Sequence, residues 1–150
     1  GQYAHGNEPS HYVIHLYNYV NRPWRTQELV DSVYRSQYAN SVDGLSGNED
    51  CGQMSAWYVL NSMGFYQVCP GKPVYSIGRP AFDKAVINLP EDKTFSIIVK
   101  NNSKENKYIE SISLNGKSLD TPFFNHQDIA NGGTMEISMT DKPNNKTHIP

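Results

Sequence analysis

The residues best suited to chemistry lie in two short polar segments, each just ahead of a predicted helix. The first is His5-Gly6-Asn7-Glu8-Pro9-Ser10-His11, and the second runs from Asp43 to Gln53. Both combine carboxylates and amides with glycines that let the backbone approach a neighbour closely. A carboxylate ahead of a helix is held ionised by free backbone N–H groups and by the helix dipole. An oriented, ionised carboxylate is the group that a general base for water attack requires.

Asp50 is the best-placed carboxylate of the second segment. It stands where the N-cap of a helix is expected, with Gln53 three residues later as its capping-box partner. Asn48 and Glu49 add side-chain oxygens next to it, and Ca²⁺ binds several such oxygens. The acidic spacing does not match an EF-hand loop. Spacing alone therefore indicates an acidic site for a sugar or a metal ion, with helix capping as the simpler role of Asp50.

Several other polar or aromatic residues have simple structural explanations. His5, His11 and His15 are of a type that more often packs or faces solvent than binds a ligand. Glu8 precedes a proline and fits a surface turn. Trp57 or one of the tyrosines could offer a flat apolar face to a sugar ring. None of these residues identifies a site by itself.

The composition excludes several classes of protein. The 150 residues contain 13 Lys and Arg against 15 Asp and Glu, which gives a net charge of −2 and no basic footprint for nucleic acid. No apolar run approaches the roughly 18 residues of a membrane span. An aromatic content of 11% is too high for a disordered chain. Cys51 and Cys69 are expected to be free, buried thiols, with a bridge between them as the alternative.

The hydrophobic period changes near residue 69. Helical spacing predicts helices over residues 12–20, 26–37 and 51–63, with the first and third buried on most sides and Gly64 ending the third. A period of two then predicts strands over residues 74–77, 82–89, 94–100, 107–114, 117–119 and 134–139. Asn115-Gly116 is typical of a type I′ hairpin, and residues 126–129 of one helical turn.

The fold class predicted from these elements is α+β. Three helices precede a small antiparallel β-sheet or sandwich. The helices are so apolar that they need neighbours on several sides, which points to a piece of a longer protein. A homo-oligomer of the chain is a second way to cover these faces.

The sequence resembles the C-terminal part of the glycoside hydrolase family 92 α-mannosidases, up to about Met139. The first matching segments are His5-Gly6-Asn7-Glu8-Pro9-Ser10-His11, Tyr17-Asn18-Tyr19, Pro23-Trp24-Arg25-Thr26-Gln27, residues 43–59, Gly64-Phe65-Tyr66, Val68-Cys69-Pro70-Gly71 and Phe82-Asp83-Lys84. Residues 100–106, 114–117 and 131–133 also match. The block from Asn48 to Trp57 is the most specific of these.

The resemblance implies a domain organisation. Residues 1–68 would be the last helices of an (α/α)6 catalytic barrel, and residues 69–140 a C-terminal β-rich region. Residues 141–150 would be a flexible tail. Members of the family have an N-terminal β-sandwich domain ahead of the barrel, with the active site between the two domains.

The resemblance also implies an activity and roles for particular residues. The family comprises Ca²⁺-dependent, inverting exo-α-mannosidases that act on N-glycans or mannan, mostly secreted or periplasmic in bacteria. Asp50 would be the general base. Asn48 replaces an acidic residue found in many relatives and would orient the attacking water. The remaining candidates are His5, Asn7 and Glu8 for substrate binding and Glu49 for the metal.

The general acid of the family lies upstream of the segment present here. The isolated chain is therefore expected to be inactive, with an α-mannoside glycan and the N-terminal remainder of the enzyme as its partners. Two other functions stay open at this stage. The chain could be a non-catalytic glycan-binding or structural module, or part of a pseudoenzyme in which Asn48 marks lost activity.

Overall fold

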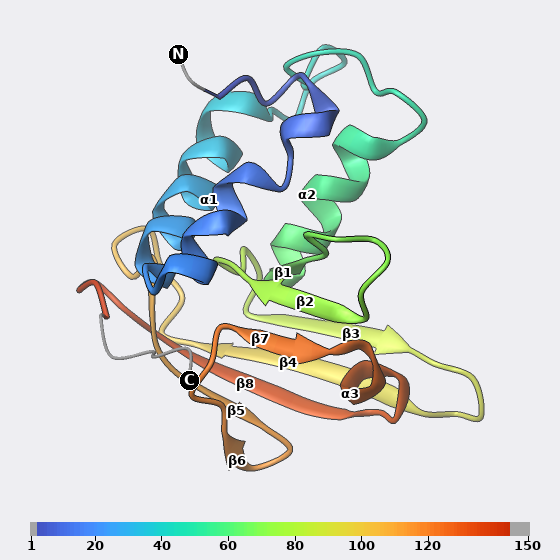
Figure 1. Ribbon diagram of the computed structural model, residues 1–150, viewed down its shortest axis with the longest axis vertical. Helices are drawn as coiled ribbons and strands as arrows, with labels where there is room; N and C mark the ends of the chain where they lie inside the picture. Colours follow the sequence, from blue (N-terminus) through green and yellow to red (C-terminus); the bar gives the residue numbers. More distant parts are fainter. Residues whose placement is uncertain (1–2, 145–150) are drawn as a thin grey trace.

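The chain separates into a helical half and a sheet half that pack against each other (Figure 1). The structure is a computed structural model that describes residues 3–144. The mixture of helices and sheets confirms the predicted α+β class. Residues 145–150, which make up most of the predicted tail, lie outside the described range. Among residues 3–144, no helix combines the length and apolar character needed to cross a bilayer.

The helical half contains two 3₁₀ helices and two α-helices. They are η1 (Glu8–Ser10), η2 (Val13–Val20), α1 (Pro23–Gln37) and α2 (Gln53–Met63). Proline at the first position of α1 suits a helix start, because its missing N–H would have no partner there. Gly64 ends α2 with φ 104°, as predicted.

The first predicted helix differs from expectation in type and in burial. It is a 3₁₀ helix, and of its side chains only Ile14, His15 and Asn18 are buried. The buried stripe is mainly polar because His15 and Asn18 bond across to Ser76 of the sheet half. The apolar side chains that suggested burial on most sides point outward instead, among them Tyr19 and Val20 with exposures of 50% and 60%.

Between residues 3 and 144, eight strands form two sheets. They are β1 (Phe65–Tyr66), β2 (Val74–Ile77), β3 (Lys84–Asn88), β4 (Thr94–Lys100), β5 (Tyr108–Leu114), β6 (Lys117–Ser118), β7 (Phe123–Asn125) and β8 (Gly133–Thr140), with α3 (His126–Ala130) before β8. The strand orders are β1-β2-β7 and β3-β4-β8-β5-β6. The predicted hairpin is confirmed, because Asn115 and Gly116 both have positive φ between β5 and β6.

The larger sheet is mixed rather than purely antiparallel. β8 enters its centre and runs parallel to β4 and antiparallel to β5. The sequence did not indicate this, because a strand pattern gives no partner. The residue pattern also did not predict β1 and β7, because these strands are only two and three residues long.

One apolar core lies between the two sheets and a second lies among the helices. The sheet core is built from side chains of both sheets, led by Phe65, Phe124, Phe95 and Ile137. The helical core surrounds Trp57, which is completely buried. Cys51 and Cys69 are free as predicted, but both are exposed rather than buried.

A buried ion pair joins the two halves. Arg79, which follows β2, places its Nε 3.2 Å from Oδ1 of Asp31 on α1. Arg35 donates two hydrogen bonds to the same carboxylate. The Arg79 guanidinium also donates to the carbonyl of Ser103, 2.8 Å away. Burial lowers the pKa of Arg79, while the Asp31 carboxylate acts in the opposite direction.

Removing one charge of this pair should destabilise the protein strongly. In Arg79→Met, the Asp31 carboxylate loses its buried partner but keeps its two bonds from Arg35, and the free energy of unfolding should fall by about 1.5–3 kcal/mol. The control is Lys100→Met, which breaks an ion pair with Glu136 whose side chains are both exposed and should cost about 0–1 kcal/mol. Urea unfolding followed by tryptophan fluorescence measures both values. Equal losses of unfolding free energy in the two variants would contradict a stabilising role for the buried Arg79–Asp31 pair.

Candidate active site

The two polar segments predicted to carry the site lie against each other. Gly6, in the first segment, is in backbone contact with Gly47, in the second. The first segment leads into η1, and the second leads into α2. The fold thus brings Asn7 and Glu8 close to the loop that carries Asn48, Glu49 and Asp50.

Asp50 lies in a tight turn rather than at the helix N-cap. Asp50, Cys51 and Gly52 have φ values of 38°, 60° and 84°, and Gly52 is the N-cap of α2. The predicted capping box with Gln53 is therefore wrong, because Gly52 takes the N-cap position and Asp50 meets the helix through its backbone carbonyl, which accepts from the N–H of Gln53 at 3.2 Å. Asp50 and Asn48 are exposed. A left-handed conformation costs a residue other than glycine of order 1–3 kcal/mol, and Asp and Asn adopt it more readily than most residues.

Glu49 fastens this turn to α2. Its Oε1 accepts a hydrogen bond from the backbone N–H of Ser55 at 2.9 Å, and its Oε2 accepts from the Ser55 hydroxyl at 2.6 Å. These bonds lower the pKa of the Glu49 carboxyl, the hydroxyl contributing most. The side chain thus acts as the helix cap that sequence reasoning assigned to Asp50.

Between residues 3 and 144, no three His, Cys, Asp or Glu side chains lie close enough together to hold a metal ion. Both oxygens of Glu49, the predicted ligand, are already engaged by Ser55. Binding of a cation by Glu49 would therefore compete with these two hydrogen bonds.

His5 is buried behind the first segment. Its Nδ1 is 2.8 Å from the Tyr3 hydroxyl, and its Nε2 is 2.7 Å from the Tyr38 hydroxyl. Tyr38 donates its proton to the carbonyl of Met54, so His5 donates from Nε2 and accepts at Nδ1. A neutral imidazole suits this arrangement, and burial lowers the pKa of His5 to about 4, helped by the nearby His11.

His11 connects the first segment to the start of α2. Its Nε2 donates to the carbonyl of His5 at 2.8 Å, and its Nδ1 accepts from Nε2 of Gln53 at 3.0 Å. The Gln53 amide also donates to the Tyr66 hydroxyl. The imidazole of His11 stacks on that of His5 with centroids 4.5 Å apart. Burial lowers the pKa of His11, against opposing effects of its bond to His5 and of the Glu8 charge.

Glu8 and Asn7 differ in their surroundings. Asn7 is exposed, and its carbonyl accepts a hydrogen bond from the Ser10 hydroxyl at 2.7 Å. Glu8 is half-buried, and its Oε1 has no accessible surface and no hydrogen-bond partner within the described residues. A buried carboxylate oxygen without a donor is costly, and because this atom has no accessible surface, a ligand could reach it only if the neighbouring atoms moved.

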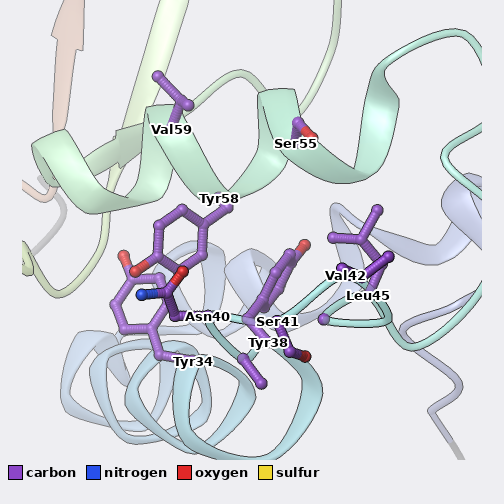
Figure 2. A pocket seen from close by; sticks show the side chains of 11 residues that line it. Tyr34, Tyr38, Asn40, Ser41, Val42, Leu45, Ser55, Tyr58 and Val59 are labelled. Atoms are coloured by element: carbon purple, nitrogen blue, oxygen red, sulfur yellow. The ribbon is translucent and has the colours of Figure 1, made fainter.

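A pocket of about 510 Å³ lies beside the second segment, between the end of α1 and α2 (Figure 2). Tyr34, Tyr38 and Tyr58 form its aromatic wall, with the Tyr38 and Tyr58 rings 4.9 Å apart. Trp57 is fully buried and stacks behind Tyr38, so it cannot be the sugar platform considered from the sequence. Ser55, the partner of Glu49, lines the same pocket.

The sequence predicts the two loops but not the side chains that hold them. Three tyrosines bond to a histidine or to Gln53, and none of them was predicted as a site residue: Tyr3, Tyr38 and Tyr66. Gln53 was predicted as a capping partner, whereas its amide bonds to His11. The sequence contains ten tyrosines, but the spacing of these residues does not predict that they lie together. Only the tertiary packing around Trp57 brings them together.

Three comparisons with known proteins agree. Residues 1–141 match the glycosyl hydrolase family 92 catalytic domain. The chain is 35% identical, over 137 residues, to an uncharacterized secreted glycosidase of Arthroderma benhamiae. The match covers 89% of this chain and 18% of the fungal protein.

Solved structures from Bacteroides thetaiotaomicron are similar throughout. One is a family GH92 α-mannosidase in complex with mannoimidazole, with a TM-score of 0.93 and 40% identity. Another is a family GH92 inverting mannosidase, with a TM-score of 0.90 and 43% identity. Each match covers 97% of this chain, but only 19% and 20% of the respective relative.

The buried histidines should make stability depend on pH on the acid side. The pKa values of folded His5 and His15 are lowered to about 4 from 6.5, so between these values the unfolded chain binds protons that the folded chain does not. The free energy of unfolding should therefore fall as the pH drops from 6.5 towards 4, by up to about 1.4 kcal/mol per pH unit for each histidine.

This dependence can be measured by denaturant unfolding across that pH range. His5→Gln should reduce the slope by about one proton. His126→Gln is the matched control, because that imidazole is exposed and contacts only the edge of the sheet half at Tyr75. A slope that both substitutions reduce equally would contradict the assignment.

Proposed function

We propose that this chain forms the C-terminal part of the active site of an inverting exo-α-mannosidase, because it belongs to glycosyl hydrolase family 92. The observation that carries the proposal is the loop at residues 47–50, which approaches Gly6 of the first polar segment at Gly47 and carries an exposed Asp50. The similarity of the chain to an α-mannosidase and to an inverting mannosidase of Bacteroides thetaiotaomicron supports α-mannosides as the substrate class and inversion at the anomeric carbon.

The chemistry needed from Asp50 is removal of one proton from water. As the water oxygen bonds to the anomeric carbon, the bond to the leaving oxygen breaks, and a separate acid protonates that oxygen. Inverting enzymes keep the two carboxyl groups roughly 6.5–9.5 Å apart to leave room for the water. Exposure of Asp50 gives water direct access, and the bonds of Glu49 to Ser55 restrict the loop that carries it.

Asn48 has a supporting role in this proposal. Its exposed amide can accept a hydrogen bond from the attacking water and orient it, but it cannot take the proton. The general acid would lie outside these 150 residues, so the isolated chain would not hydrolyse mannosides. The substrates would be α-mannosides of N-glycans or mannan, and the first polar segment (His5, Asn7 and Glu8) would contact the sugar.

We also propose that the enzyme is secreted. The fungal relative is a secreted glycosidase, which supports this location. Polymeric mannan and N-glycans are met outside the cytoplasm, which fits the same location.

Asp50→Asn tests the proposed base directly. In the full-length enzyme that carries this sequence, kcat on an α-mannoside should fall by about 10²–10⁴-fold, because the amide keeps the shape of the side chain but cannot accept the proton. Initial rates and circular dichroism measure activity and fold together.

Asp92→Asn is the matched control for this substitution. Asp92 is also an exposed aspartate in a left-handed turn, with φ 56°, but it lies between β3 and β4. Its variant should keep wild-type turnover. Full turnover by a folded Asp50→Asn enzyme would remove Asp50 from the role of base and favour a structural role for this loop.

Calcium belongs to the proposal for the complete enzyme. Because residues 3–144 hold no cluster of three metal-binding side chains, most ligands would come from other segments, with Glu49 as the candidate from this chain. Chelation by EDTA should abolish turnover, and added Ca²⁺ should restore it.

Glu49→Gln should raise the Ca²⁺ concentration needed for half-maximal turnover by about tenfold, since the variant loses a negative charge that favours the cation. Glu91→Gln is the control, because Glu91 is an exposed carboxylate in the β3–β4 turn. A calcium requirement that Glu49→Gln leaves unchanged would assign Glu49 to holding the loop only.

A further inference from the structure

We propose that Gly6 and Gly47 are positioning residues that set the distance between the two loops of the site. This inference rests on the proposed function, since it concerns how the proposed sugar-binding loop and the proposed base loop are placed relative to each other. It assigns a role to two residues that have no side chain and that bring no chemistry of their own.

The two loops meet through their backbones at these glycines. A Cβ atom added to Gly6 would lie 2.4 Å from the carbonyl oxygen of Ser46. A Cβ added to Gly47 would lie 3.0 Å from both Cα and the carbonyl oxygen of Gly6. Both obstacles are backbone atoms, so no rotation of a flexible side chain can relieve the clash.

The requirement for glycine here is one of space and not of backbone conformation. Among the glycines between residues 3 and 144, those with positive φ are Gly52, Gly64, Gly116, Gly132 and Gly133. Gly6 and Gly47 are absent from this set, so alanine is compatible with the backbone dihedral angles at both positions. What excludes a larger residue is the closeness of the facing loop.

The backbone contact between Gly6 and Gly47 links the two loops directly, whereas the other bonds that hold each loop go to different elements. The second loop is held at one end by a β-bridge between Tyr38 and Leu45 and at the other by the bonds of Glu49 to Ser55. The first loop is held by His5, which bonds to Tyr38. Within residues 3–144, no hydrogen bond runs directly from residues 4–8 to residues 43–50. Van der Waals contact at the glycines therefore sets the separation.

This separation matters because proposed reactive groups follow each glycine at once. Asn7 and Glu8 come directly after Gly6, and Asn48 to Asp50 come directly after Gly47. Pushing the loops apart would move the base relative to the sugar. Misplacement by about 1 Å can cost about 100-fold in rate.

The experiment compares alanine variants of the full-length enzyme. Gly6→Ala and Gly47→Ala should each lower kcat by about 10- to 100-fold, with the larger loss in Gly6→Ala because its Cβ meets the shorter contact. Amide hydrogen exchange should become faster at residues 4–8 and 46–50 in both variants. This exchange reports loop separation without any need for turnover.

Two control variants separate positioning from general damage. Gly71→Ala adds a methyl group where nothing lies within 4 Å, and it should change neither kcat nor exchange. Gly78→Ala places Cβ 3.2 Å from the His15 ring, in the packing between the halves. It should lower the melting temperature but leave kcat within about twofold when assayed well below melting.

The possible outcomes are distinct. Unchanged kcat in Gly6→Ala and Gly47→Ala overturns the inference, and so does an equal loss in Gly78→Ala. Faster loop exchange with wild-type turnover also overturns it, even if Asp50→Asn is inactive. If Asp50→Asn keeps full turnover while the glycine variants lose it, the proposed base is wrong and the positioning role stands.

Discussion

The burial of Trp57 is the constraint on which the rest of the helical half depends. Its indole N–H donates to the carbonyl of His11, and its own carbonyl accepts from the Asn61 amide. Tyr38 stacks on one side of the ring system and His5 meets it edge-on. The first polar segment, the end of α1 and the start of α2 are thus fixed to one side chain. The candidate site is the exposed rim of this packed centre.

Sequence patterns predicted the parts of the fold that local chemistry determines. Gly64, the Asn115-Gly116 turn and the short helix before β8 follow from backbone preferences of few residues, and all are present. The two polar loops were predicted from residue types and spacing for the same reason, since the residues of each loop are contiguous in the chain.

The rest depended on contacts that no local pattern encodes. Asp50 looked like a cap, but Glu49 bonds to Ser55 and takes that role. The composition of the run from Tyr12 to Val20 predicted burial on most sides. The side that is buried is determined instead by polar contacts, such as the bond from Asn18 to Ser76, which lies 58 residues away in the chain.

The central position of β8 in the larger sheet has a consequence for how the protein is made. β4 and β5 precede β8 in the chain, but the larger sheet joins them only through β8, whose last residue is Thr140. Until that strand is synthesised, β4 and β5 keep unpaired edges, and such non-local pairing is slow to form. The loops with the proposed chemistry precede all of these strands in the chain. Folding of the larger sheet therefore has its vulnerable interval before β8 is available.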